Sequence, residues 1–100
     1  MSKTICPKFE YASQVLGKRW VSLILHELLT GPKRFKELEH SIELSGKVLA
    51  ERLKELEEEG FIRREVYPEI PVRIEYSLSP KGQSMKKIFD SIAEWSQEWV

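Results

Sequence analysis

Cysteine, histidine and aspartate are scarce in this sequence of 100 residues. The only thiol, Cys6, cannot form a disulfide within the chain, which fits a reducing compartment and leaves a free thiol to explain. Two histidines, His26 and His40, fall in helical patterns and share no ligand spacing with the cysteine, so no metal site is predicted. Asp90 is the only aspartate, and no nucleophile, base and orienting acid are predicted to meet. We therefore expect neither an enzyme nor a bound cofactor.

Long hydrophobic runs are also missing. No stretch of about 18 apolar residues is present, and the first residues do not combine a basic segment, an apolar run and a cleavage site. A soluble, cytoplasmic chain is therefore expected. With 41% apolar residues, a chain of this length buries roughly 60 to 65% of its unfolded surface, which predicts one domain over residues 1–100.

Net charge is zero, because 16 Lys and Arg balance 16 Asp and Glu. A neutral chain argues against nucleic-acid binding, whose usual mark is a basic domain. The distribution is nevertheless uneven. Residues 1–54 hold ten basic and six acidic side chains, whereas residues 55–100 hold six basic and ten acidic ones. This segregation allows a basic face to form.

Four helices are predicted in the first 60 residues from apolar side chains at spacings of three and four. Ser45 is the expected N-cap of the fourth helix, about residues 46–59, and Gly60 is its expected C-terminal stop. This helix buries one face and presents the other, on which Lys47 and Lys54 lie. The four apolar stripes are Phe9, Ala12 and Leu16; Trp20, Leu23, Ile24 and Leu28; Phe35, Leu38 and Ile42; and Leu49, Leu53 and Leu56.

Beyond Gly60 the apolar period changes from helical spacing to two, which indicates strands. In the first predicted strand Ile62, Arg64 and Val66 alternate with Arg63, Glu65 and Tyr67; in the second, Val72, Ile74, Tyr76 and Leu78 alternate with Arg73, Glu75, Ser77 and Ser79. The segment from Pro68 to Pro71 lacks two backbone donors and cannot continue a ladder. A hairpin of about residues 61–79 is therefore predicted, with its tip at these prolines.

A last helix, about residues 80–99, is predicted to start at Ser79-Pro80. Its apolar stripe contains two tryptophans and is too large for so small a domain to cover. We expect it to pack, with the first helix, against a second copy in a two-fold homodimer. The predicted interface residues are Phe9, Met85, Ile88, Phe89, Ile92, Trp95 and Trp99.

Helices followed by a helix that leads straight into a hairpin predict an α+β, mostly helical fold: a winged helix-turn-helix DNA-binding domain with N- and C-terminal dimerisation helices. The segments "LGKRWVSLILHELLTGPKRFKEL" and "LAERLKELEEEGFIRREVYPEIPVRIEYSLSPKG", with the early "CP" and a terminal tryptophan helix, resemble the HxlR family of transcription regulators. The resemblance covers nearly the whole chain and implies a dimeric regulator. Some members sense electrophiles or oxidants through an N-terminal cysteine. Members that link two different cysteines between subunits need a second thiol, which this chain lacks.

The fourth helix is the predicted recognition helix, and Ser45 and Lys47 at its start are expected to face base edges or phosphates in the major groove. The alternative is an ordinary solvated helix face. Further candidates for contacts with DNA are Lys18, Lys33 and Arg34 at helix starts or the preceding turn, and Lys54 farther along the recognition helix.

Two arginines are predicted to bind DNA with an ion pair as the competing interpretation. Arg52 lies beside the apolar face, where a pair with Glu37 is as plausible as a DNA contact. Arg73 follows the hairpin tip and is the best candidate to place a cation in the minor groove. Its alternative is a cross-strand pair with a glutamate of the wing.

Cys6 is the candidate regulatory residue, because it is solitary and stands in an extended segment just before a helix. Lys3 and Lys8 are expected to lower the pKa of its thiol. A buried inert thiol is the alternative. Oxidation or alkylation by a quinone-like electrophile near the dimer seam is expected to shift the spacing of the two recognition helices.

The sequence thus predicts a sequence-specific DNA-binding transcription regulator, a repressor that acts as a homodimer on an inverted-repeat operator and is switched at Cys6 by an oxidant or electrophile such as diamide or a quinone. One alternative is a winged helix that binds proteins without specific DNA binding. Another is a regulator that is switched by a non-covalent small ligand. The first alternative requires the basic residues to be scattered rather than gathered on one face.

Overall fold

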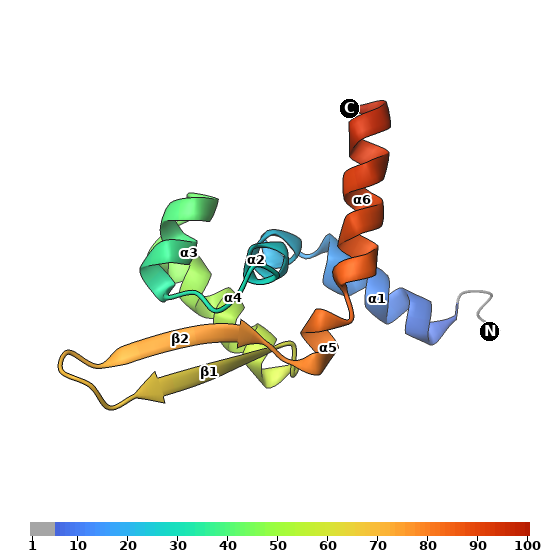
Figure 1. Cartoon of the computed structure of the whole chain (residues 1–100). Helices are drawn as coiled ribbons and strands as arrows, with labels where there is room; N and C mark the ends of the chain where they lie inside the picture. The colour runs from blue at the N-terminus through green and yellow to red at the C-terminus, as the bar shows by residue number, and fades with distance from the viewer. Residues whose placement is uncertain (1–5) are drawn as a thin grey trace.

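The computed structural model describes residues 6–100 and arranges them as helices around the base of a long two-stranded hairpin (Figure 1). The elements are α1 (Pro7–Gly17), α2 (Val21–Leu28), α3 (Phe35–Ile42), α4 (Gly46–Glu58), β1 (Ile62–Tyr67), β2 (Arg73–Leu78), α5 (Pro80–Gln83) and α6 (Lys86–Trp99). This order is that of a winged helix-turn-helix, which confirms the predicted fold class. Among the helices of residues 6–100, none is long and apolar enough to cross a membrane.

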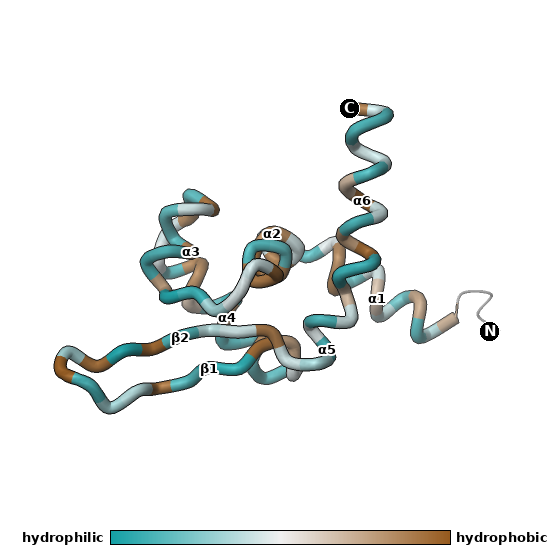
Figure 2. Tube along the Cα trace, in the orientation of Figure 1, coloured by the Kyte–Doolittle hydropathy of each residue, from teal (hydrophilic) through white to brown (hydrophobic). Residues whose placement is uncertain are grey.

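Helix α2 forms the centre of the core, as its hydropathy suggests (Figure 2). Ile24, Leu25 and Leu28 are at most 1% exposed, and leucines of α3 and α4 pack around them. The predicted stripe of this helix was partly wrong, because Leu23 is 53% exposed. Trp20 precedes the helix at a left-handed φ of 75°, so α2 begins one residue later and turns Val21 into the core.

The hairpin is an antiparallel ladder whose register runs from Ile62 opposite Leu78 to Tyr67 opposite Arg73. Ile62 and Leu78 are buried at its base, while the strands run outward beyond the core. Lys33, in the turn before α3, exchanges two backbone hydrogen bonds with Tyr76, with N–O distances of 2.9 and 2.8 Å. The wing is therefore attached to the helix-turn-helix by backbone as well as by side chains.

The C-terminal segment is broken into α5 and α6, whereas one helix over residues 80–99 was predicted. Ser79 caps α5 by accepting a hydrogen bond from the Gly82 N–H, and its hydroxyl donates to the carbonyl of Gly60. A Cβ at Gly82 would lie 2.3 Å from the carbonyl oxygen of Phe61, so this turn requires glycine. The break follows at Met85, which turns into the core of its own chain.

Helix α6 leaves the body at a steep angle to α1 (Figure 1). Met85 and Phe89 were predicted to lie in a dimer interface, but they are only 7% and 4% exposed within a single chain. The first turns of α6 therefore complete the core of the chain itself, and the dimer interface stays a prediction. The apolar surface that α6 leaves exposed consists of Ile92, Trp95 and Trp99.

Candidate DNA-binding face and thiol site

Helix α4 presents a polar face whose start is capped by Ser45. The Ser45 hydroxyl accepts a hydrogen bond from the Val48 N–H at 3.3 Å, which leaves other first-turn N–H groups directed outward. Lys47 and Lys54 are exposed on this face, while the leucines of the same helix are buried. No ion pair involves either lysine among the described residues. The start of α4 therefore offers to a phosphate or base edge both backbone donors and a lysine that has no ion pair within residues 6–100.

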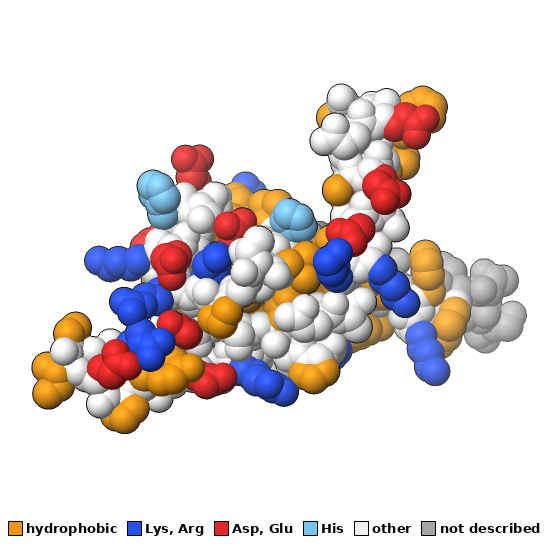
Figure 3. Space-filling model, in the orientation of Figure 1, with side chains coloured by type: hydrophobic (Ala, Val, Ile, Leu, Met, Phe, Trp, Pro, Cys, Tyr) orange, Lys and Arg blue, Asp and Glu red, His pale blue; other side chains and the backbone are white. Residues whose placement is uncertain are grey.

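The turn before α3 supplies two more of the predicted cations. Arg34 is the N-cap residue of α3, its backbone N–H donates to the Glu37 carboxylate at 2.9 Å, and the residue is exposed. Lys33 is half-buried because its backbone pairs with β2. Basic side chains gather between α3 and the wing on the face shown in Figure 3. The structure thus brings these two residues to the same end of the molecule as the wing.

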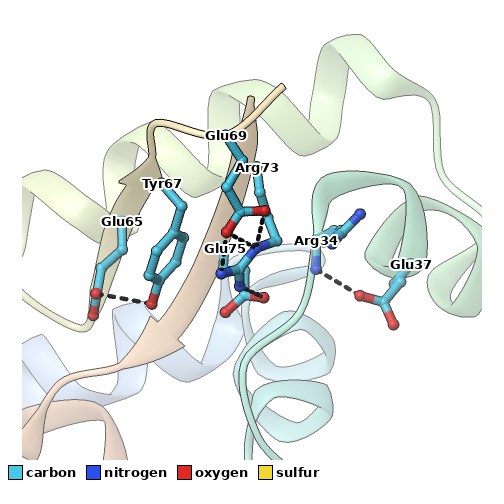
Figure 4. Close-up of polar contacts among 7 residues, drawn as sticks. All are labelled: Arg34, Glu37, Glu65, Tyr67, Glu69, Arg73 and Glu75. Atoms are coloured by element: carbon cyan, nitrogen blue, oxygen red, sulfur yellow. Dashed lines mark hydrogen bonds and ion pairs between the residues drawn. The ribbon is translucent and has the colours of Figure 1, made fainter. Parts of the chain in front are cut away.

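Arg73 is occupied by carboxylates of the wing itself (Figure 4). Its Nη1 lies 2.6 Å from Glu75 Oε2, and its Nη2 lies 2.8 Å from Glu69 Oε2. The guanidinium also stacks 3.8 Å from the centre of the Tyr67 ring. These hydrogen bonds raise the pKa of Arg73 and lower the pKa of the Glu69 carboxyl. The alternative predicted from sequence, an ion pair between Arg73 and a glutamate of the wing, is closer to the structure. The two glutamates lie at the tip and on the same strand as Arg73, not on the opposite strand.

Lys18 and Arg52 share one carboxylate, Glu55 of α4. Arg52 Nη1 lies 2.8 Å from Glu55 Oε1, and the Lys18 ammonium forms an ion pair with Glu55 Oε2. The hydrogen bond from Lys18 is the main reason that the pKa of Glu55 is lowered. The predicted partner of Arg52, Glu37, was wrong because that residue caps α3 instead. Lys18 ties the turn before α2 to α4, whereas Arg52 pairs with a glutamate of its own helix, so each of these two predicted DNA ligands has a carboxylate partner.

Sequence reasoning passed over Glu55 and the two exposed arginines of β1, Arg63 and Arg64. A signal for the first was present, because Arg52 and Glu55 stand at helical i,i+3 spacing. The arginines were placed in a strand but not considered as DNA contacts. Arg63 and Arg64 lie near the base of the wing, and both residues are exposed.

Cys6 is exposed and occupies the N-cap position of α1, directly before Pro7. The backbone N–H groups of Phe9 and then Lys8 lower the pKa of the thiol, because a helix N-terminus favours the thiolate. The predicted direction is confirmed, but the cause differs from the expected lysine charges. Lys3 lies outside the described residues. The thiol is therefore accessible, and the alternative of a buried thiol is wrong.

Exposed apolar side chains cover two regions near the chain ends. Phe9 of α1 is 69% exposed, and Trp95 and Trp99 of α6 are 61% and 67% exposed. A groove of about 200 Å³ between α2 and α6 is lined by Ser22, Leu23, His26, Phe89, Ile92 and Ala93. Ile88, also predicted in the interface, is half-buried against the protomer core. Within residues 6–100 no cluster of three His, Cys, Asp or Glu side chains has the geometry of a metal site.

Comparison with known proteins supports the DNA-binding architecture. The chain is 54% identical over 97 residues to the HTH-type transcriptional regulator YvaP of Bacillus subtilis (strain 168), covering 96% of this chain and 90% of YvaP. It is 47% identical over 100 residues to the HTH-type transcriptional regulator YodB of the same organism, covering 99% of this chain and 89% of YodB.

The structure also superimposes on crystal structures of YodB. The reduced form gives a TM-score of 0.86 at 46% identity, covering 97% of this chain and 96% of YodB. Quinone-bound YodB gives a TM-score of 0.82 at 43% identity, covering 95% of this chain and 100% of YodB. Residues 15–100 match the family described as HxlR-like helix-turn-helix. Since this match covers most of the winged domain built above, the chain belongs to the HxlR-like helix-turn-helix family of DNA-binding transcriptional regulators.

Proposed function

We propose that the chain is a homodimeric repressor that binds an inverted-repeat operator and is released when Cys6 is oxidised or alkylated. The exposed Cys6 thiol at the start of α1, with its lowered pKa, is the observation that carries this proposal. A thiolate is the nucleophilic form of cysteine, so a lowered pKa increases its reactivity at neutral pH. The existence of a quinone-bound form of the related YodB supports an electrophile as the effector.

The proposed DNA contacts centre on α4. Ser45 and Lys47 at its start enter the major groove, and Lys54 lies farther along the same exposed face. Lys33 and Arg34 add phosphate contacts from the turn before α3. Two such faces in a two-fold dimer read half-sites about 10 bp apart, one on each successive turn of the major groove.

The proposed dimer interface uses the apolar surface that the protomer leaves exposed. Ile92, Trp95 and Trp99 of α6 and Phe9 of α1 are exposed, and we assign both regions to the interface. So large an exposed apolar area is typical of a protein–protein contact. Because Cys6 lies at the start of the helix that carries Phe9, a group added to the thiol disturbs the same seam.

The switch chemistry needs no second cysteine in the chain. With a quinone, the Cys6 thiolate adds to a ring carbon; the hydrogen of that carbon then moves to oxygen as the ring becomes aromatic again, and one proton from solvent completes the hydroquinone thioether. With diamide, two thiols lose two electrons and two protons to the N=N bond and form a disulfide, either between the Cys6 residues of two subunits or with a small thiol. A coupling of about 3 kcal/mol between this modification and DNA binding changes affinity roughly 150-fold.

Gel-shift titration on DNA around the chain's own gene tests the proposal with reduced, diamide-treated and benzoquinone-treated protein. The reduced protein should bind a specific fragment, and both treatments should weaken binding by roughly 100-fold. Cys6→Ser should bind as the reduced protein does and ignore both reagents. Release of the Cys6→Ser variant by either reagent would eliminate the thiol switch.

Sedimentation measurements test the dimer separately. Trp95→Glu should give monomers, because it places a charge in the proposed apolar interface. The control is Lys87→Glu, an exposed residue of the same helix outside the apolar stripe, which should leave the dimer intact. A Trp95→Glu protein that sediments as the wild type would place the interface elsewhere.

A further inference from the structure

The tip of the wing is apolar and almost fully solvent-exposed. Ile70 is 102% exposed and Val72 is 56% exposed, and Pro68 and Pro71 stand beside them. The hydropathy trace shows hydrophobic residues at this far end of the hairpin, and the space-filling view shows the corresponding side chains in solvent (Figures 2 and 3). An exposed apolar group on a projecting hairpin contributes nothing to the core and is typical of a contact surface.

The charges of the outer wing are unsuited to holding phosphate. Residues 65–75 contain three glutamates and one arginine. That arginine, Arg73, has Glu69 and Glu75 on its guanidinium and Tyr67 beneath it. The two prolines of the tip also lack the backbone N–H that would bind a phosphate. The outer wing therefore lacks a cation available to DNA.

The same contacts hold the tip in one place. The ladder puts Glu65, Tyr67, Arg73 and Glu75 on one face of the hairpin, while Val66 and Ile74 lie on the other. Arg73 joins the tip to the strand through Glu69 and Glu75, and nearby Arg34 adds to the lowering of the Glu69 pKa. The tip thus lies within electrostatic range of Arg34, in the turn before α3. Arg73 acts as a positioning residue for Ile70.

We propose that Ile70, with Pro71 and Val72, enters the minor groove beside the major groove occupied by α4 and contacts DNA through hydrocarbon surface rather than charge. This inference rests on the proposed operator binding. Isoleucine and proline are among the side chains that minor-groove proteins insert against base steps. The groove is about 6 Å wide and admits such a side chain. Pyrimidine–purine steps, which open most easily, are the expected sequence at that position.

Operator titration across a salt series tests the proposal with Ile70→Ser and Ile70→Leu. Ile70→Ser should weaken operator binding roughly tenfold, the effect expected when about two methylene groups lose their contact. The slope of log affinity against log salt should stay unchanged, because no phosphate contact is lost. Ile70→Leu keeps the hydrocarbon and should bind within about twofold of the wild type. Both variants should fold, since the side chain is outside the core.

Dimethyl sulfate probing locates the contact, since it methylates adenine N3 in the minor groove and guanine N7 in the major groove. Adenine N3 atoms flanking the α4 site should be protected by the wild type and exposed in Ile70→Ser, while guanine protection persists. If Ile70→Ser binds and protects like the wild type, the tip contacts another partner, such as a protein, and the inference is wrong. If the wild type and Ile70→Leu also fail to bind any specific fragment, the proposed operator binding has failed instead.

Discussion

The start of α4 and the tip of the wing, the two proposed DNA contacts, differ in charge and in polarity. At the start of α4, Lys47 is exposed without an ion pair among the described residues, and Ser45 orders the first turn. At the wing, Arg73 is held by two glutamates and the outermost side chain is Ile70. Helix α4 can offer DNA a positive charge, whereas the wing tip can offer it an apolar surface. A chain with zero net charge can still present a basic face when its positive and negative side chains are unevenly distributed.

Removing charge from α4 should have the largest effect. Lys47→Ala is expected to weaken specific operator binding by 10-fold to about 100-fold, the usual range for loss of a base-reading contact, and non-specific binding by much less. Fluorescence anisotropy with operator and scrambled duplexes measures both affinities. The control is Lys87→Ala on α6, which should leave both affinities within about twofold of the wild type. Equal losses on the two duplexes would show that Lys47 contacts phosphate only.

Substitutions at Ser45 separate the cap from the DNA contact. Ser45→Ala removes the acceptor for the Val48 N–H and should cost about 1 kcal/mol of folding stability. Ser45→Asp keeps a good N-cap, so its melting temperature should match the wild type, while its negative charge beside phosphate should lower operator affinity about tenfold. Calorimetry and anisotropy on the same samples give both values. If Ser45→Asp binds the operator normally, the start of α4 does not face DNA.

Releasing the wing should have a smaller effect on DNA binding. Arg73→Met removes the guanidinium from Glu69 and Glu75 and should weaken operator binding a few-fold, because Ile70 is less firmly placed and two carboxylates lose their partner. The expected salt slope is that of the wild type, since Arg73 contacts no phosphate. A shallower slope in Arg73→Met would mean that Arg73 leaves its glutamates to bind DNA.

The fold was predictable because its local signals agree with one another. Spacing of apolar residues, Ser45 as a cap and the change of period after Gly60 each predicted an element that the structure contains. The C-terminal break was missed because it depends on a tertiary contact. Gly82 must approach the Phe61 carbonyl, and Met85 fills a space in the core that no local pattern reveals.

The candidate site was only partly predictable, because charge in a sequence does not reveal its partner. Lys18 and Arg52 were grouped with the DNA ligands, yet both meet Glu55, which lies far from Lys18 in sequence. The place of Cys6 just before a helix was predictable, because a thiol before Pro7 is a local feature, whereas its regulatory role stays a prediction. The apolar wing tip was visible in the sequence, but only its exposure distinguishes it from a core strand.

Loss of the ion pair between Lys18 and Glu55 should have the smallest effect, a small loss of folding stability. The pH dependence of stability separates this contribution from the others. The pKa of Glu55 is lowered in the folded chain, so its contribution to stability is present above the unfolded pKa of about 4.3 and is lost as pH falls through the lower folded value. Both side chains are more than a third exposed, so screening limits this contribution to about 1 kcal/mol or less.

Thermal melts of the wild type and Glu55→Gln should therefore differ at pH 7 and converge as pH falls below about 4. Adding salt at pH 7 should narrow the gap in the same way, because it screens an exposed pair. The matched variant Glu58→Gln, an exposed glutamate of the same helix, should melt like the wild type at both pH values. If the difference in melting temperature between the wild type and Glu55→Gln persists below pH 4, Glu55 supports α4 through packing, and its charge is not what joins α4 to the turn before α2.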